Sequence, residues 1–81
     1  MTEVVVYSSN MCGACEMVKG YLKLKNVNFV EKNVSTDLKG RSELTEQGFD
    51  STPVAMIGDQ WLSGFDVKEI DAALALIGQT E

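Results

Sequence analysis

Short apolar runs separated by polar breaks organise the first part of the chain. The run from Glu3 to Tyr7 is short and rich in β-branched residues, which is typical of a buried strand. From Cys12 to Lys25 the pattern changes to helical spacing, and Asn26 can adopt the left-handed conformation that ends a helix. The apolar positions of this helix are Cys15, Val18 and Leu22. The run from Asn28 to Val34 then predicts a second strand.

Capping residues mark two further helices. Asp37 is a suitable N-cap for a helix that reaches Gln47 and is closed by Gly48. Gly40 inside this helix costs about 1 kcal/mol relative to alanine. Asp66 and Glu69 have the spacing of a capping box at the start of the last helix. The apolar face and the stop of that helix are formed by Ile70, Ala73, Leu74, Ile77 and Gly78.

Between these two helices the pattern predicts a hairpin. Pro53 breaks the chain, and Val54–Ile57 and Gln60–Ser63 are strands joined by the turn at residues 58–59. The element order is therefore βαβαββα. Since a helix joins the first two strands, they should be parallel with a right-handed crossover. We expect an α/β protein with a mixed sheet of four strands flanked by three helices.

Composition and charge narrow the class of protein. The chain has 81 residues, of which 44% are hydrophobic and 23% charged, so we expect one globular domain over residues 1–81. The net charge of −5 and the lack of a basic cluster argue against nucleic acid or anionic lipid as a partner. No basic leader precedes the first strand, and no apolar run is long enough to span a bilayer. We therefore expect a cytoplasmic monomer that makes no contact with a membrane.

The only two cysteines of the chain lie two residues apart, in Cys12-Gly13-Ala14-Cys15. If Cys12 occupies the first helical position, Cys15 lies one turn later on the same face, so the two sulfurs can meet. Free backbone N–H groups and the helix dipole would stabilise a thiolate at Cys12. A disulfide across so short a loop restricts the unfolded chain very little. Such a bond contributes little to the stability of the fold and is better suited to a redox-active site.

This geometry predicts thiol–disulfide exchange. Cys12 would attack a substrate disulfide as the nucleophile, and Cys15, the more buried thiol, would then resolve the mixed disulfide. The alternative from another class is a metal site. Because the chain has no histidine and no third cysteine, zinc or an iron–sulfur cluster would need a dimer to complete four thiolate ligands. We expect no bound metal and no bound cofactor.

Three motifs in the same order resemble the glutaredoxin-like branch of the thioredoxin superfamily. They are the Cys12-Gly13-Ala14-Cys15 dithiol after the first strand, Thr52-Pro53-Val54 at the third strand, and Ser63-Gly64-Phe65-Asp66 before the last helix. The resemblance covers nearly the whole chain and implies a thioredoxin-like fold. It also implies a thiol–disulfide oxidoreductase.

The same resemblance implies roles for five more residues. Pro53 would be the cis proline beside the disulfide, and Thr52 would offer its backbone groups to an extended substrate. Gly64 would let a substrate backbone approach, or it is a simple turn glycine. Phe65 would line the substrate groove, or it is a core residue. Asp66 is a helix cap on local evidence, and in glutaredoxins an aspartate near this place also holds glutathione.

Two branches of the family differ in their source of electrons. Glutathione-dependent glutaredoxins usually carry Cys-Pro-Tyr-Cys and a Gly-Gly pair, where this chain has Gly13-Ala14 and Ser63-Gly64. The segment Trp61-Leu62-Ser63-Gly64-Phe65 is similar to the Trp-Ser-Gly-Phe segment of NrdH redoxins with one residue inserted. That similarity implies electrons from thioredoxin reductase and delivery to ribonucleotide reductase. Trp61 would be either a surface anchor for a partner or a core aromatic. Glutathione as the reductant is the alternative.

Overall fold

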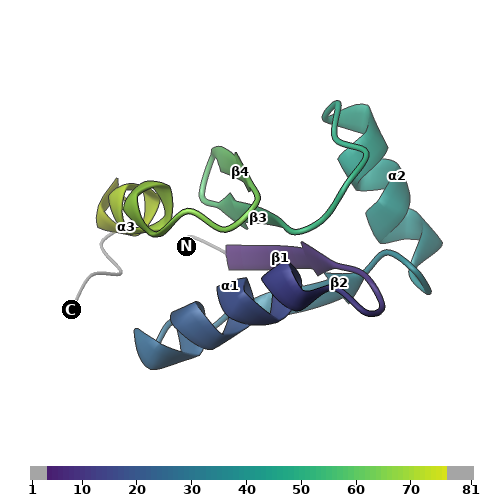
Figure 1. Cartoon of the computed structure of the whole chain (residues 1–81). Coiled ribbons are helices and arrows are strands. Elements are labelled where there is room, and N and C mark those ends of the chain that lie inside the picture. The colour runs from purple at the N-terminus through teal and green to yellow at the C-terminus, as the bar shows by residue number, and fades with distance from the viewer. Residues whose placement is uncertain (1–3, 77–81) are drawn as a thin grey trace.

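The computed structural model describes residues 4–76 and has the predicted order of elements (Figure 1). The elements are β1 (Val4–Ser8), α1 (Gly13–Leu24), β2 (Val30–Asn33), α2 (Leu38–Glu46), β3 (Val54–Ile57), β4 (Gln60–Ser63) and α3 (Val67–Leu76). The predicted ends of the last helix, Ile77 and Gly78, lie outside the described residues. No helix within residues 4–76 is long and apolar enough to cross a membrane.

The four strands form one mixed sheet in the order β2-β1-β3-β4. Strands β1 and β2 are parallel, as expected for two strands joined through a helix, and Val5 lies opposite Val30. Strand β3 runs antiparallel to both of its neighbours, β1 and β4. The predicted α/β architecture is therefore confirmed, and it places the C-terminal end of β1 beside the start of β3.

Alternation along β1 divides the hydrophobic residues between two faces of the sheet. Val4 and Val6 pack with α1 and α3 in the larger cluster. Val5 and Tyr7 point to the other face and pack with Leu44 of α2. Helix α2 lies apart from α1 and α3 in Figure 1, in agreement with this division. Every residue of β1 is thus buried, which explains its uninterrupted apolar pattern.

Two predicted strands differ from the observed ones at their ends. The first strand was expected to stop at Tyr7, but Ser8 still pairs with Asn33 and belongs to β1. The second was expected over residues 28–34, yet only Val30–Asn33 are in the strand. The apolar pattern extends beyond β2 because its neighbours also pack against the core. Phe29 contacts the larger cluster from outside the sheet, and Val34 contacts the smaller cluster while its N–H donates to the Ser8 carbonyl at 2.8 Å.

The predicted caps of α1 and α2 are present. Asn26 has φ 60° and Gly48 has φ 88°, so both adopt the left-handed conformation after their helices. Asp37 is the N-cap of α2, and its carboxylate accepts a hydrogen bond from the Gly40 N–H at 3.0 Å. A Cβ at Gly40 would lie 3.2 Å from that carboxylate and 3.4 Å from the Lys32 Cβ. Close packing against the cap and β2 therefore explains a glycine inside this helix.

An aromatic stack covers the face of the sheet below α2. The Trp61 ring stacks on Tyr7 at a centroid distance of 5.6 Å and on Phe49 at 6.0 Å. Trp61 is half-buried and packs against the smaller hydrophobic cluster. The structure thus shows that Trp61 packs against the core, while a role as surface anchor for a partner stays a prediction.

A shared carboxylate ties α2 to the sheet and makes stability depend on pH. Glu43 Oε1 accepts hydrogen bonds from Lys32 Nζ and Tyr7 Oη, both at 2.9 Å. These two bonds lower the pKa of Glu43 below 4.5, the usual value for glutamate. Because the folded state favours the carboxylate, the stabilisation is present above that value and is lost as the pH falls through the lowered pKa.

Glu43→Gln is therefore expected to lower the free energy of unfolding at neutral pH by roughly 0.2–1 kcal/mol, the range for partly exposed ion pairs. The difference from the wild type should shrink below about pH 4.5. Urea unfolding across an acid pH series measures it, with Glu46→Gln on the same helix as the control. A difference that stays constant with pH would contradict the assignment.

Candidate functional site

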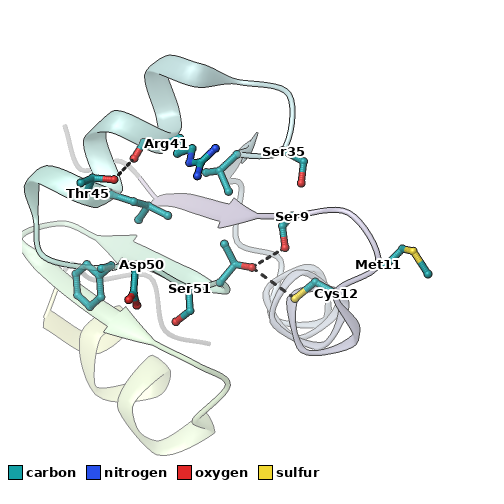
Figure 2. Close-up of a pocket in the computed structure, with 12 residues that line it drawn as sticks. Ser9, Met11, Cys12, Ser35, Arg41, Thr45, Asp50 and Ser51 are labelled. Atoms are coloured by element: carbon teal, nitrogen blue, oxygen red, sulfur yellow. Dashed lines mark hydrogen bonds between the residues drawn. The ribbon is translucent and has the colours of Figure 1, made fainter.

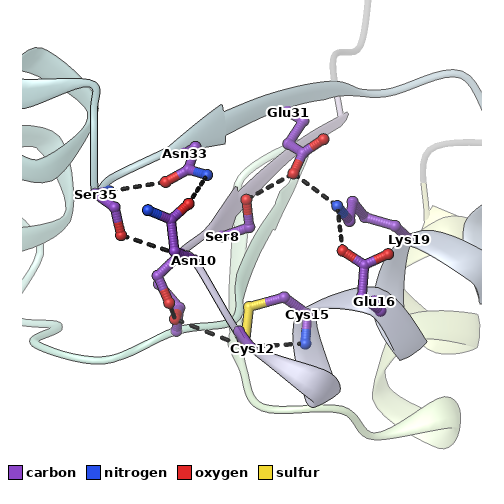
Figure 3. The surroundings of a disulfide bond; sticks show 11 residues. Ser8, Asn10, Cys12, Cys15, Glu16, Lys19, Glu31, Asn33 and Ser35 are labelled. Atoms are coloured by element: carbon purple, nitrogen blue, oxygen red, sulfur yellow. Dashed lines mark hydrogen bonds and ion pairs between the residues drawn. A yellow bond between two sulfur atoms is a disulfide. The ribbon is translucent and has the colours of Figure 1, made fainter.

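The two cysteines form a disulfide at the N-terminal end of α1 (Figure 3). The sequence placed Cys12 at the first helical position, but Cys12 is the N-cap, with extended φ and ψ of −110° and 103°. Its sulfur accepts a hydrogen bond from the Cys15 N–H at 3.1 Å, in the way that a cap oxygen does. The N-cap position favours a thiolate at Cys12 more strongly than the first helical position would, because an N-cap side chain faces the free N–H groups of the first turn.

The two sulfurs differ in their access to solvent. Cys15 is only 1% exposed and is therefore shielded from an incoming protein substrate. Cys12 is half-buried and lies at the surface end of the pair. The order of attack expected from the sequence, Cys12 first and Cys15 second, matches this difference in exposure.

Hydrogen bonds hold the loop that carries Cys12. The Asn10 N–H donates to Ser35 Oγ at 3.1 Å, and Asn33 Nδ2 donates to Asn10 Oδ1 at 3.0 Å. Met11 follows with φ 55°, an uncommon conformation for a residue with a side chain, and its side chain is fully exposed. The loop between β1 and α1 is thus tied to the end of β2 and presents Met11 beside the disulfide.

Thr52 and Pro53 approach the disulfide from the start of β3. The peptide bond between them is cis, as the family resemblance implied. Thr52 Oγ1 lies 3.9 Å from Cys12 Sγ and 2.7 Å from Ser9 Oγ, forming a chain of hydroxyl groups that ends at the sulfur (Figure 2). The sequence indicates a role only for the backbone of Thr52 and gives no signal for Ser9. Nothing in their spacing, 43 positions apart, could indicate the contact.

Gly64 and Phe65 directly follow β4, and Gly64 is hydrogen-bonded to Pro53. The Gly64 N–H donates to the Pro53 carbonyl at 2.9 Å, and Gly64 has φ 78°, a conformation that favours glycine. A Cβ built on Gly64 would meet no atom within 4 Å, so its surroundings are open. The Phe65 ring packs edge-on against Tyr21 and the larger hydrophobic cluster. A substrate-binding role for Gly64 and Phe65 stays a prediction.

Asp66 is the N-terminal cap of α3. Its Oδ1 accepts hydrogen bonds from the N–H groups of Lys68 at 3.0 Å and Glu69 at 3.3 Å. The capping role read from the sequence is confirmed, and a role in holding a ligand stays a prediction.

Two substitutions test the capping role of Asp66. Asp66→Ala should lower the free energy of unfolding by about 1 kcal/mol because the cap is lost, whereas Asp66→Asn should leave stability close to the wild type. Urea unfolding of both variants measures the effect. If Asp66→Asn were as destabilised as Asp66→Ala, charge rather than capping would be the source of the stability.

A cluster of charges lies next to the disulfide on α1 and β2 (Figure 3). Lys19 Nζ lies 2.8 Å from Glu16 Oε2 and 2.7 Å from Glu31 Oε2, and Ser8 Oγ donates to Glu31 Oε2 at 2.7 Å. Hydrogen bonds to Glu16 and Glu31 raise the pKa of Lys19. Hydrogen bonds from Lys19 and Ser8 lower the pKa of Glu31. Lys19 therefore stays protonated, and its charge is balanced by carboxylates rather than directed at Cys12.

A cleft of about 600 Å³ opens beside Cys12 (Figure 2). Its walls are the loop before α1, one face of α2 and the loop that leads into β3. Of the residues predicted for the site, Cys12 and Thr52 line this cleft. Its α2 wall, which includes Arg41 and Thr45, has no signal in the sequence. Within residues 4–76 no group of three or more metal-ligating side chains is found.

Comparison with known proteins agrees with this geometry. Residues 4–62 match the family model described as glutaredoxin. A glutaredoxin-like 8.6 kDa protein in the rubredoxin operon of Clostridium pasteurianum is 39% identical over 69 residues, which cover 84% of this chain and 92% of that protein. The glutaredoxin-like protein NrdH of Lactococcus lactis subsp. cremoris is 36% identical over 67 residues, covering 83% of this chain and 93% of the relative.

The fold is also that of a solved redoxin. The NrdH-redoxin from Escherichia coli superposes with a TM-score of 0.81 at 28% identity, covering 86% of this chain and 92% of the other. Its published description gives that glutaredoxin-like protein a thioredoxin-like activity profile. The family match, the thioredoxin-like fold and the Cys12–Cys15 disulfide agree with one another. The chain therefore belongs to the glutaredoxin family and is a thiol–disulfide redoxin of the NrdH type.

Proposed function

We propose that this redoxin reduces disulfides of other proteins through Cys12 and Cys15 and is recharged by thioredoxin reductase. The observation that carries the proposal is the unequal exposure of the two sulfurs at the start of α1. Cys12 is half-buried beside an open cleft, so a substrate can reach its sulfur, as the attacking nucleophile requires. Cys15 is only 1% exposed, so its sulfur is shielded from a substrate and is placed to attack Cys12 as the resolving thiol.

The reaction proceeds in two exchanges that balance in bonds and electrons. The Cys12 thiolate attacks one sulfur of the substrate disulfide, forming a mixed disulfide and releasing the other substrate sulfur as a thiolate. The Cys15 thiolate then attacks Cys12 Sγ, which breaks the mixed disulfide and forms the Cys12–Cys15 bond. Two electrons have passed to the substrate, whose second sulfur takes up a proton from solvent. A reductase returns two electrons to the protein.

The start of β3 is the proposed docking point for the substrate backbone. Within residues 4–76 neither the N–H nor the C=O of Thr52 pairs with another backbone group. An extended substrate segment can therefore pair with Thr52 in the manner of an added strand. Gly64 lies next to Pro53 with open space around its Cα, so it would allow the same segment to pass closely.

Several features support thioredoxin reductase over glutathione as the electron source. Relatives named NrdH share 36% identity with this chain over most of its length. The dithiol spacer is Gly13-Ala14, and Ser63-Gly64 stands where glutathione-dependent glutaredoxins have two glycines. By the same resemblance, ribonucleotide reductase is the proposed protein substrate, and a monomer in the cytoplasm is the proposed acting form.

A coupled assay distinguishes the two electron sources. The protein would be mixed with NADPH and insulin, and either with thioredoxin reductase or with glutathione and glutathione reductase. We expect NADPH oxidation with thioredoxin reductase and little with glutathione. Turnover with glutathione alone would show a glutathione-dependent glutaredoxin. Turnover with neither donor, together with metal-dependent visible absorbance of protein purified without oxygen, would favour the dimeric metal-binding alternative.

A further inference from the structure

The cleft beside Cys12 has a charged group that disulfide exchange alone does not require. Arg41 is the only arginine of the chain, and it lines the cleft from α2 (Figure 2). Within residues 4–76 no carboxylate lies within ion-pair distance of its guanidinium group. By contrast, Lys19 and Lys32 are both bound to carboxylates. Arg41 is thus a cation available to a ligand on a protein whose net charge is −5.

The other charge in the cleft lies on a different wall. Asp50, in the loop before β3, is the one carboxylate among the lining residues described. Arg41 and Asp50 do not form an ion pair with each other. The remaining polar groups of the walls are hydroxyls, including those of Ser35 and Thr45. Arg41 is therefore the one cationic side chain among the lining residues described, and a guanidinium group suits a carboxylate.

The reaction determines what occupies this cleft. Because Cys12 is part of its wall, a substrate joined to Cys12 in the mixed disulfide has its flanking residues at the cleft. Thr52 lines the same cleft and would hold the backbone of that segment. A side chain of the substrate that points toward α2 then meets Arg41.

We propose that Arg41 selects protein substrates with an acidic side chain within a few residues of the reactive cysteine. The inference rests on the proposed function, since it names the substrate feature that the same site recognises. Arg41 is a specificity-determining residue and takes no part in the exchange of electrons.

Peptides that differ in one side chain test the proposal. Each peptide carries one cysteine activated as a neutral pyridyl disulfide, has acetylated and amidated ends, and places Glu, Gln or Lys at the same flanking positions. Release of the pyridine thione reports the attack of reduced Cys12. We expect the wild type to react about two- to fivefold faster with the Glu peptide than with the Gln peptide, the effect of an exposed ion pair. Added salt should reduce this preference.

Charge variants give the decisive comparison. Arg41→Gln should abolish the preference for Glu, and Arg41→Glu should reverse it in favour of the Lys peptide. Lys39→Gln removes a charge from the same helix outside the cleft and should keep the preference. No preference in the wild type, or the same preference in Arg41→Gln, would overturn this inference while leaving the redoxin function intact. Failure of reduced wild type to attack any peptide would instead overturn the proposed function.

Discussion

Cys12→Ser is expected to reduce insulin disulfides no faster than a protein-free control. A serine hydroxyl is not ionised at neutral pH and cannot replace a thiolate as the attacking group. The variant should still fold, because Cys12 is the N-cap of α1 and serine is among the preferred residues at that position. The NADPH-coupled assay measures activity, and urea unfolding measures stability. Residual activity above the control would show that another group attacks the substrate.

Cys15→Ser should give the complementary result within the same mechanism. Without the resolving thiol, the mixed disulfide between Cys12 and the substrate should accumulate. Intact mass spectrometry would detect the mixed disulfide as an increase in protein mass equal to the mass of the substrate. Dithiothreitol should reverse this increase. Because Cys15 is 1% exposed, a serine buries a hydroxyl there, so Cys15→Ala serves as the apolar control for folding. Full turnover of a protein disulfide by either variant would contradict resolution by Cys15.

Thr52→Val is expected to slow the reaction of Cys12 with iodoacetamide at about pH 6 by roughly threefold to tenfold. Thr52 Oγ1 lies 3.9 Å from Cys12 Sγ, and a hydrogen bond to a charged group contributes about 1.5–3 kcal/mol when well formed. Because the contact is long, we expect it to contribute less than this range, about 0.6–1.4 kcal/mol, which corresponds to the threefold to tenfold change. Removing the hydroxyl destabilises the thiolate, so a smaller fraction of Cys12 is ionised. At high pH, where ionisation is complete, the variant should react as fast as the wild type or faster.

Two further variants separate the hydroxyl chain from packing effects. Ser9 Oγ lies 2.7 Å from Thr52 Oγ1, and when Ser9 donates, the Thr52 hydroxyl is free to donate to sulfur. Ser9→Ala should therefore give a smaller change in the same direction. Thr45→Val removes a hydroxyl that lines the same cleft and bonds to the Arg41 carbonyl, so it is the control. Equal slowing by Thr45→Val would attribute the effect to the cleft in general.

The fold was predictable from sequence because local signals and tertiary packing agree. The buried strand at Val4–Ser8, the cap at Asp37 and the proline before β3 each have a local physical cause that the structure confirms. The strand ends were less predictable, because an apolar side chain can pack against the core from outside the ladder. Phe29 is such a case, lying before β2 yet contacting the larger cluster.

The site was predictable only where its residues are close in sequence or carry a recognisable motif. Cys12 and Cys15 are three positions apart, so helix geometry alone brings them together. Ser9 contacts Thr52 because the start of β3 lies beside the end of β1. Arg41 lines the cleft because α2 also lies near the end of β1. No spacing in the sequence indicates these contacts, because they depend on the order of strands in the sheet.

The aromatic stack also gives the protein an internal fluorescent probe. Trp61 is the only tryptophan, so all indole emission comes from one position. Phe49 stacks on that indole and also lines the cleft beside Cys12. A ligand that enters the cleft and displaces the Phe49 ring changes the surroundings of the indole. Emission from the unlabelled protein can therefore report both the occupancy of the cleft and the loss of packing on unfolding.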